Sequence, residues 1–251
     1  MISLHDVSLT YNTLKGESVH ALERITLNVE DGQFVSIIGP SGCGKSTVLK
    51  VIGGLLDADS GKATVDGGSP AEARKKARFG FVFQNPVLLP WKTAIENTVL
   101  PLKILKRLDD ASSKAHDLLK LVGLSGFENK YPKELSGGMQ QRVAIARALV
   151  FDPPVLLMDE PFGALDEITR DRLNVDMLRI WRETHRTITF VTHSIPEAVF
   201  LSQRVVVLSK APAIVKSIID IPLPYPRNIQ TKDTIDYVNH VRQVREALDI
   251  S

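Results

Sequence analysis

Eight consecutive residues near the start of the chain match the pattern G-x-x-x-x-G-K-[S/T]: Gly39-Pro40-Ser41-Gly42-Cys43-Gly44-Lys45-Ser46. Glycines at these spacings allow positive φ angles, so backbone N–H groups can approach phosphate oxygens closely. Lys45 would add positive charge at the β- and γ-phosphates, and the Ser46 hydroxyl would bind Mg²⁺. A chance glycine-rich turn is the alternative. The pattern predicts a loop that binds a nucleoside triphosphate, a feature shared by kinases, GTPases, helicases and transport ATPases.

The residues on either side of the loop favour that interpretation. Phe34–Ile38 is a short apolar run typical of a buried strand, and the helical pattern Thr47–Leu56 follows the loop. The positive end of that helix would point at the phosphates. We call residues Gly39–Thr47 the phosphate cradle. Cys43 within it is interpreted as a small residue that fits the loop, and a redox sensor is the alternative.

Short apolar strands alternate with helical patterns along most of the chain. Strands are expected at 79–83, 155–158, 188–191 and 205–208, and helices at 139–150 and 167–184. This alternation predicts an α/β protein with a mostly parallel sheet covered on both faces. The stretch from about 90 to 135 carries helical patterns, such as Ala111–Leu121, and no convincing strand. It is interpreted as a helical insertion.

The two ends of the chain differ from this core. Residues 4–11 and 19–29 are predicted to be strands, and the second half of 19–29 has the alternation of a half-buried antiparallel strand. After Pro212 the composition changes, and three prolines favour an extended segment. A final helix is expected from about Thr234, with an apolar face that covers the core or a dimer edge rather than a regulator. That face comprises Ile235, Val238, Val241, Val244 and Leu248.

Composition and charge exclude several classes of protein. The chain has 251 residues, and 31 Lys+Arg against 29 Asp+Glu give a net charge of +2. This near-balance argues against nucleic acid as a partner. The single cysteine excludes an intrachain disulfide, as is typical of a reducing compartment. Neither a secretory leader nor an apolar run long enough to span a bilayer is evident, so work at a membrane would depend on another chain.

Two acidic residues, Asp159 and Glu160, directly follow the apolar run Val155–Met158. A strand that ends beside the cradle can bring Asp159 to the Mg²⁺ shell and place Glu160 to orient and polarise an attacking water. An exposed strand terminus is the alternative. GTPases and small-molecule kinases generally lack such an adjacent glutamate, so the pair together with the cradle indicates nucleotide hydrolysis.

A second glycine-rich helix start lies at Leu135-Ser136-Gly137-Gly138-Met139. Exposed N–H groups at a helix start, with the Ser136 hydroxyl, make a second anion site. An ordinary helix N-cap is the alternative. One phosphate chain cannot occupy two distant sites in the same subunit. A head-to-tail pair, in which each second site closes on the other subunit's nucleotide, would account for both.

Taken together, these residues resemble the ATP-binding-cassette (ABC) ATPase family over about residues 2–215. The family's LSGGQ pattern appears here as Leu135–Met139, where Met139 replaces the commoner glutamine and the serine and both glycines are kept. The resemblance implies the P-loop NTPase fold of ABC ATPases, with a mostly parallel core sheet, an antiparallel β subdomain and a helical subdomain inserted at about 90–150. It implies an ABC ATPase domain at 1–215, followed by a proline-rich segment and terminal helix at 216–251.

Further residues gain a role only through this resemblance. Gln84 resembles the glutamine that contacts Mg²⁺ or water and relays nucleotide state to a membrane partner. Ala164-Leu165-Asp166 resembles the D-loop, which crosses the dimer interface. His193 resembles the switch histidine at the γ-phosphate, and Tyr11 lies where the family places an aromatic that stacks on adenine. A strand aromatic is the alternative for Tyr11.

The resemblance implies ATP and Mg²⁺ as cofactors and the following site residues. The expected catalytic residues are Lys45, Gln84, Glu160 and His193, and the expected metal ligands are Ser46, Gln84 and Asp159. The residues expected to contact the nucleotide are Tyr11, Gly39, Pro40, Ser41, Gly42, Cys43, Gly44, Lys45, Ser46, Thr47, Ser136, Gly137 and Gly138.

Three segments further resemble the nitrate/sulfonate/taurine branch of importer ATPases, which also includes transporters of pyrimidine precursors: the "LLPW" run at 88–91, the stretch 192–202 and the "LPLPYPR" tail at 221–227. The resemblance implies a homodimeric ATPase subunit at the cytoplasmic face of the inner membrane. Its partners would be an integral-membrane permease and, indirectly, an extracytoplasmic solute-binding protein. The alternatives are an exporter or division-complex ATPase, a soluble ABC mechanoenzyme, and a regulatory subunit with negligible turnover.

The "LLPW" run is unusual for a surface loop. Two leucines and Trp91 between prolines are costly to expose, which suggests a docking patch. Packing of Leu88, Leu89 and Trp91 into the helical insertion is the alternative, and each interpretation can hold for different residues.

Overall fold

The computed structural model describes residues 1–12, 18–163 and 165–249. Its centre is a six-stranded sheet in the order β5-β6-β7-β3-β8-β9. The first five of these strands run parallel and β9 runs antiparallel to β8. The prediction of a mostly parallel α/β sheet is therefore confirmed. The strands are β3 (Phe34–Ile38), β5 (Phe79–Val82), β6 (Val155–Asp159), β7 (Thr187–Thr192), β8 (Arg204–Leu208) and β9 (Val215–Asp220).

A separate three-stranded antiparallel sheet has the order β2-β1-β4. Its strands are β1 (Ile2–Asn12), β2 (Ser18–Val29) and β4 (Ser60–Val65). β1 and β2 match the expected strands, but β4 and β9 were not predicted. In β4 only Val65 is buried, and β9 is an edge strand with a single buried residue, Ile219. Neither carries the apolar run from which a strand is inferred.

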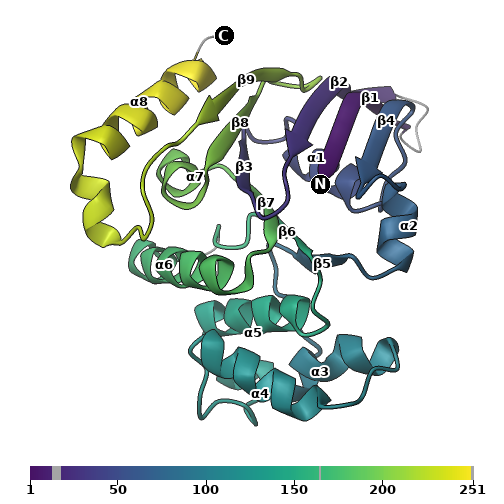
Figure 1. Ribbon diagram of the computed structural model, residues 1–251, viewed down its shortest axis with the longest axis vertical. Coiled ribbons are helices and arrows are strands. Elements are labelled where there is room, and N and C mark those ends of the chain that lie inside the picture. Colours follow the sequence, from purple (N-terminus) through teal and green to yellow (C-terminus); the bar gives the residue numbers. More distant parts are fainter. Residues whose placement is uncertain (13–17, 164, 250–251) are drawn as a thin grey trace.

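The six-stranded sheet is covered on both faces, as the alternation predicted. Successive residues of β3 point to opposite sides: Phe34 and Ile38 join one buried cluster, and Val35 and Ile37 join the other. Figure 1 shows α6 and α7 on one side of the sheet, with α1 and the three-stranded sheet on the other. The helices are α1 (Lys45–Ile52), α2 (Pro70–Lys75), α6 (Glu167–Thr184) and α7 (Ile195–Leu201).

Three helices form a layer of their own at the bottom of Figure 1. They are α3 (Ala94–Ile104), α4 (Ala111–Leu121) and α5 (Gly137–Leu149), and a short 3₁₀ turn at Pro132–Glu134 precedes α5. α3 packs on both α4 and α5. Between 90 and 135 this layer contains helices and no strand among the described residues. The layer reaches the sheet through α5, whose residues belong to the larger buried cluster.

The C-terminal segment ends in α8 (Ile235–Asp249), after a 3₁₀ turn at Ile229–Asp233. The expected apolar face is wrong in part. Ile235 is 78% exposed and Val238 is 55% exposed. The face against the core instead comprises Tyr237, Val241, Val244 and Leu248. This spacing follows the 3.6-residue period more closely, because Tyr237 replaces the first two residues of the expected stripe. None of the described helices is long and apolar enough to span a membrane.

Candidate nucleotide site

The phosphate cradle joins the C-terminal end of β3 to the start of α1. Gly42 has φ +73° and Gly44 has φ +116°, which are conformations that residues with a side chain rarely adopt. A Cβ on Gly44 would also lie 3.0 Å from the carbonyl oxygen of Ala21. The buried strand Phe34–Ile38 fixes one end of the loop, so its backbone amides are held at the N-terminus of α1.

Lys45 lies across the loop rather than toward solvent. Its side chain is 5% exposed, and its ammonium donates to the carbonyl oxygens of Gly39 and Pro40, each at 3.0 Å. The same nitrogen lies 3.8 Å from Glu160 Oε1. A buried ammonium is costly unless it is paired and hydrogen-bonded. These contacts hold the charge of Lys45 at the point where the loop and β6 meet.

Ser46 and Asp159 bring two oxygen atoms together. The Ser46 hydroxyl donates to Asp159 Oδ1 at 2.7 Å. Burial raises the pKa of Asp159, while the hydrogen bond from Ser46 opposes the rise. A hydroxyl and a carboxylate are hard oxygen ligands, and Mg²⁺ is often bound by only one or two such groups plus phosphate oxygens. This donor pair therefore fits Mg²⁺ beside a bound triphosphate.

Glu160 and His193 come from the ends of the neighbouring parallel strands β6 and β7. The Glu160 N–H donates to the Val191 carbonyl oxygen at 2.9 Å, which continues the ladder between the strands. His193 Nδ1 and Glu160 Oε2 are 2.9 Å apart. Glu160 has φ +43°, a strained value for a residue with a side chain, and such strain tends to occur at functional sites. The two side chains thus form a pair beside Lys45.

Gln84 follows β5, on the far side of β6 from His193. Its exposed side chain reaches the same region. The position that a Cβ would take on Gly163 lies 3.6 Å from both Gln84 Nε2 and Glu160 Oε2. Gln84 and Glu160 therefore face one small space next to Gly163, which is wide enough there because residue 163 has no side chain.

A pocket of about 310 Å³ is lined by residues of the cradle and by Glu160. Tyr11 forms one wall, with its hydroxyl 3.1 Å from Thr47 Oγ1 in a hydrogen bond to which either can donate. Cys43 is buried beneath the loop, and burial raises the pKa of its thiol. Redox-sensing cysteines are accessible and have a lowered pKa, so the structure favours the small-residue interpretation of Cys43.

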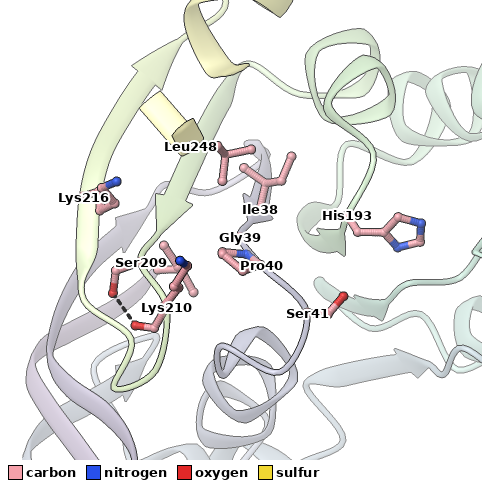
Figure 2. Close-up of a pocket in the computed structure, with 10 residues that line it drawn as sticks. Ile38, Gly39, Pro40, Ser41, His193, Ser209, Lys210, Lys216 and Leu248 are labelled. Carbon is pink, nitrogen blue, oxygen red and sulfur yellow. Dashed lines mark hydrogen bonds between the residues drawn. The ribbon is translucent and has the colours of Figure 1, made fainter. Parts of the chain in front are cut away.

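A larger pocket of about 710 Å³ adjoins the other side of the cradle. Figure 2 shows His193 and Ser41 on one side of it, Ser209 and Lys210 on the other, and Leu248 of α8 near Ile38. His193 is about half exposed toward this space. The cradle is thus open on two sides within a single chain.

The second predicted anion site begins helix α5. Ser136 is its N-cap, and the Ser136 hydroxyl accepts a hydrogen bond from the Met139 N–H at 3.3 Å. Ser136 and Gly137 are exposed, whereas Gly138 is buried against α6. Among the described residues that line the two pockets at the cradle, neither Ser136 nor the two glycines appear. The structure therefore does not bring this segment to the cradle of its own chain.

In the predicted D-loop, Ala164 lies outside the described residues. Asp166 is the N-cap of α6, where its side chain accepts a hydrogen bond from the Thr169 N–H at 2.9 Å. Backbone hydrogen bonds, that of Thr169 first, lower the pKa of Asp166. Within one chain, Asp166 therefore acts as an ordinary helix cap.

Sequence reasoning missed three polar residues that hold the segment after β5. Gln141 is 2% exposed and donates to the Phe83 carbonyl oxygen at 3.2 Å. Arg147 donates to the carbonyl oxygens of Pro86 and Val87, and the side chain of buried Asn97 bonds both backbone groups of Leu89. The only signal in the sequence was a set of polar residues on otherwise apolar helix faces. These contacts fix the loop that carries Gln84.

The same contacts decide where the side chains of the "LLPW" run lie. Leu88 packs against the larger buried cluster, whereas Trp91 is 69% exposed. Packing is therefore confirmed for Leu88, and docking through the exposed Trp91 stays a prediction.

Comparison with known proteins decides the family. The family model described as "ABC transporter" matches residues 22–163, which is more than half of the chain. The chain belongs to the ABC transporter family. Its predicted membership is thus confirmed, and ATP is the nucleotide expected of this ABC cassette in the pocket over Gly39–Thr47.

Curated relatives of this ABC protein include two importer subunits. The aliphatic sulfonates import ATP-binding protein SsuB of Bacillus cereus is 46% identical over 227 residues, covering 90% of this chain and 88% of that protein. The taurine import ATP-binding protein TauB of Rhizobium johnstonii is 44% identical over 223 residues, covering 88% of this chain and 84% of that protein.

A solved structure extends the comparison to the fold. The dimeric post-hydrolysis state of the ATP-binding cassette MJ0796 bound to ADP and Pi has a TM-score of 0.78 and 37% sequence identity. The superposition covers 89% of this chain and 100% of the MJ0796 chain. The predicted ABC ATPase fold is therefore confirmed, and the similar cassette is dimeric.

Proposed function

We propose that this chain is the ATP-hydrolysing subunit of an importer and works as a homodimer on a separate membrane permease. The observation that carries the proposal is the cluster at the ends of β3, β6 and β7. There, Lys45 lies 3.8 Å from Glu160, and Glu160 lies 2.9 Å from His193, directly beside the phosphate cradle. A fixed cation, a carboxylate and an imidazole around one phosphate loop suit hydrolysis of a terminal phosphoanhydride.

In this mechanism the backbone amides of the cradle and Lys45 hold the phosphates, and Tyr11 packs on the adenine. Ser46 and Asp159 would hold Mg²⁺, which would neutralise charge on the phosphate oxygens. Glu160 orients the attacking water and accepts its proton. His193 holds the Glu160 carboxylate in place and faces the γ-phosphate, while Gln84 contributes its amide to the same space.

The homodimer supplies what one chain lacks. Ser136 and Gly137 present a helix N-terminus and a hydroxyl to solvent, which suits binding of a phosphate from another copy. The dimeric form of the similar cassette MJ0796 supports this arrangement. Two ATP molecules would then lie between the cradle of one copy and α5 of the other. ATP binding closes the dimer, and hydrolysis lets it open again. The difference in ATP affinity between the closed and the open dimer would then drive the conformational change of the permease.

The relatives support a solute class and a set of partners. Two curated relatives are named for import of aliphatic sulfonates and of taurine, and we propose a solute of this sulfonate type, delivered by an extracytoplasmic binding protein. The permease would contact a docking patch made of Phe83, Val87 and Trp91, which are 41%, 63% and 69% exposed. The chain would thus lie at the cytoplasmic face of the inner membrane.

The variant Glu160→Gln tests this function. We expect ATP binding to be kept and hydrolysis to fall by about a thousandfold, because an amide cannot accept the proton of the water. In the presence of ATP, the variant should then accumulate as a dimer, which light scattering detects. Vesicles that contain the permease and this variant should not take up sulfonate. Glu23→Gln, an exposed glutamate on β2, is the control. Normal hydrolysis by Glu160→Gln would show that Glu160 has another role. If the wild-type chain hydrolyses ATP in these vesicles but no sulfonate is taken up, the proposed solute is rejected.

A further inference from the structure

The orientation of His193 depends on the first turn of helix α7. The residues on both sides of His193 are bound to this turn: the Thr192 hydroxyl donates to the Glu197 carboxylate and accepts from the Ser194 N–H at 3.0 Å. Burial raises the pKa of Glu197 to about 6, so above that pH it is an ionised acceptor. The Ser194 side chain caps α7 by accepting from the Glu197 N–H. A shift of α7 would therefore move His193 relative to Glu160.

The C-terminal segment holds the far end of this helix through one arginine. Arg227 is 3% exposed, and its Nη1 donates to the carbonyl oxygens of Val199 and Phe200 in α7, each at 3.0 Å, and to that of the C-cap residue Ser202 at 2.9 Å. The other terminal nitrogen donates to two carbonyl oxygens of its own segment, those of Ile221 and Leu223. One side chain thus joins the tail to the C-terminal end of α7.

The physical setting of Arg227 makes this contact specific. The guanidinium carbon lies 4.0 Å from the centre of the Tyr225 ring, and the guanidinium contacts this ring and carbonyl oxygens. A cation is stabilised at a helix C-terminus, where the carbonyl dipoles point outward. Five carbonyl oxygens lie within reach of the four N–H groups on the two terminal nitrogens of the planar guanidinium, an arrangement that the three donors of a lysine ammonium do not reproduce.

Two tyrosine hydroxyls complete the attachment. Tyr225 donates to the Leu201 carbonyl oxygen at 3.0 Å, near the end of α7, and Tyr237 of α8 donates to the Pro196 carbonyl oxygen at 2.9 Å, in its first turn. Burial raises the pKa of Tyr225 to about 12 and raises that of Tyr237 as well, so both remain donors at neutral pH. We call Tyr225, Arg227 and Tyr237 the α7 clamp.

We propose that the α7 clamp is a positioning device for His193: the C-terminal segment fixes α7, and α7 fixes the loop that sets the His193–Glu160 contact. The proposal rests on the role given above to His193 in hydrolysis. It assigns the residues after 216 a part in the reaction beyond covering the core.

The test uses the full chain with Tyr237→Phe and Arg227→Met. Tyr237→Phe keeps the buried ring and removes one hydrogen bond, so we expect kcat for ATP hydrolysis to fall about threefold. Arg227→Met removes the three hydrogen bonds from the guanidinium to the end of α7 and should lower kcat about tenfold, because small displacements of a reacting group are costly. In both variants KM for ATP should stay within about twofold of the wild type, since the cradle is untouched. Arg204→Met, which removes a surface ion pair with Asp220 between β8 and β9, is the control.

A second readout follows His193 directly. The chain has six histidines, and comparison with His193→Ala assigns the ring-nitrogen NMR signals of His193. In Tyr237→Phe these signals should shift while those of the four histidines that lie outside α8 and differ from His193 stay in place: His5, His20, His116 and His185. The α7 clamp is rejected if kcat stays at the wild-type value or if the His193 signals do not move. If Arg227→Met does not fold, Tyr237→Phe alone decides.

The same experiment separates this proposal from the proposed function. If His193→Ala hydrolyses ATP at the normal rate, then the role of His193 itself is wrong. If His193→Ala is impaired but Tyr237→Phe behaves as the wild type, the ATPase mechanism stands and the α7 clamp alone is rejected.

Discussion

The phosphate cradle and the start of helix α5 are both glycine-rich helix N-termini, but the chain treats them differently. At the cradle, Lys45 and Ser46 have partners from a distant part of the sequence: Lys45 lies 3.8 Å from Glu160, and Ser46 bonds Asp159. At α5, the Ser136 hydroxyl bonds the Met139 N–H of its own first turn, and among the described residues no distant side chain covers it. The fold of one chain brings the side chains of the first site together, whereas it leaves the second site exposed at the surface.

This difference indicates which half of the nucleotide site depends on assembly. A cradle that is complete within one chain can bind ATP as a monomer. An exposed helix N-terminus has no ligand of its own until another molecule supplies one. Binding should therefore depend on the cradle alone, and hydrolysis should depend on both regions.

The largest effect is expected from Lys45→Ala. The substitution removes the buried charge that faces the phosphates and leaves the carbonyl oxygens of Gly39 and Pro40 without their donor. We expect hydrolysis to fall below detection and the affinity for ATP to fall by about a hundredfold, as measured with a fluorescent ATP analogue. Lys76→Ala, an exposed lysine after α2, is the control. Near-normal turnover would show that the cradle has been misassigned.

Gly137→Asp should separate binding from hydrolysis. Within the described part of the chain, the nearest atom to a Cβ at Gly137 is Leu165 Cδ2 at 3.7 Å, whereas a Cβ at Gly138 would lie 2.9 Å from Thr169 Cγ2, so position 137 tolerates a side chain better. The added carboxylate suits the first turn of α5 but would repel a phosphate from another copy. We expect unchanged ATP binding and hydrolysis about a hundredfold lower.

Mixing the two variants makes the comparison decisive. A heterodimer of Lys45→Ala and Gly137→Asp contains one site with both defects and one site with none. Because random pairing gives half heterodimers, each with one intact site of two, the mixture should recover about a quarter of the wild-type rate. A mixture no more active than the separate variants would contradict the head-to-tail arrangement, even if each variant behaves as expected alone.

The two regions also differ in how far sequence alone could describe them. The cradle is contiguous, so its glycines, Lys45 and Ser46 indicate both the loop and its ligand. The contact of Glu160 with His193 depends on the pairing of β6 with β7, which no local pattern encodes. The resemblance to a family was needed to place His193, and without it a lone histidine after a strand has no assigned role.

Other features were missed because their signal lies in the tertiary structure. Edge strand β9 lacks an apolar run, and its pairing with β8 supplies the order that its sequence does not. Arg227 looks like an exposed charge in a proline-rich tail, yet it is buried under the end of α7. The stripe of α8 was shifted because an exposed Ile235 and a buried Tyr237 reverse the usual preference.

The smallest and most discriminating effect concerns Ser136, whose role within one chain is that of a helix N-cap. Ser136→Ala should lower the free energy of unfolding by about 1 kcal/mol, whereas Ser136→Asp should leave it unchanged, because aspartate caps as well as serine. If the hydroxyl also donates to a phosphate of the second copy, both variants should hydrolyse ATP at least about tenfold more slowly, since neither alanine nor an ionised aspartate has a side-chain donor. Thermal unfolding and steady-state hydrolysis measure the two quantities separately. Wild-type hydrolysis by Ser136→Asp would mean that Ser136 only caps α5, and the contrast between the two regions would then reduce to the two glycines.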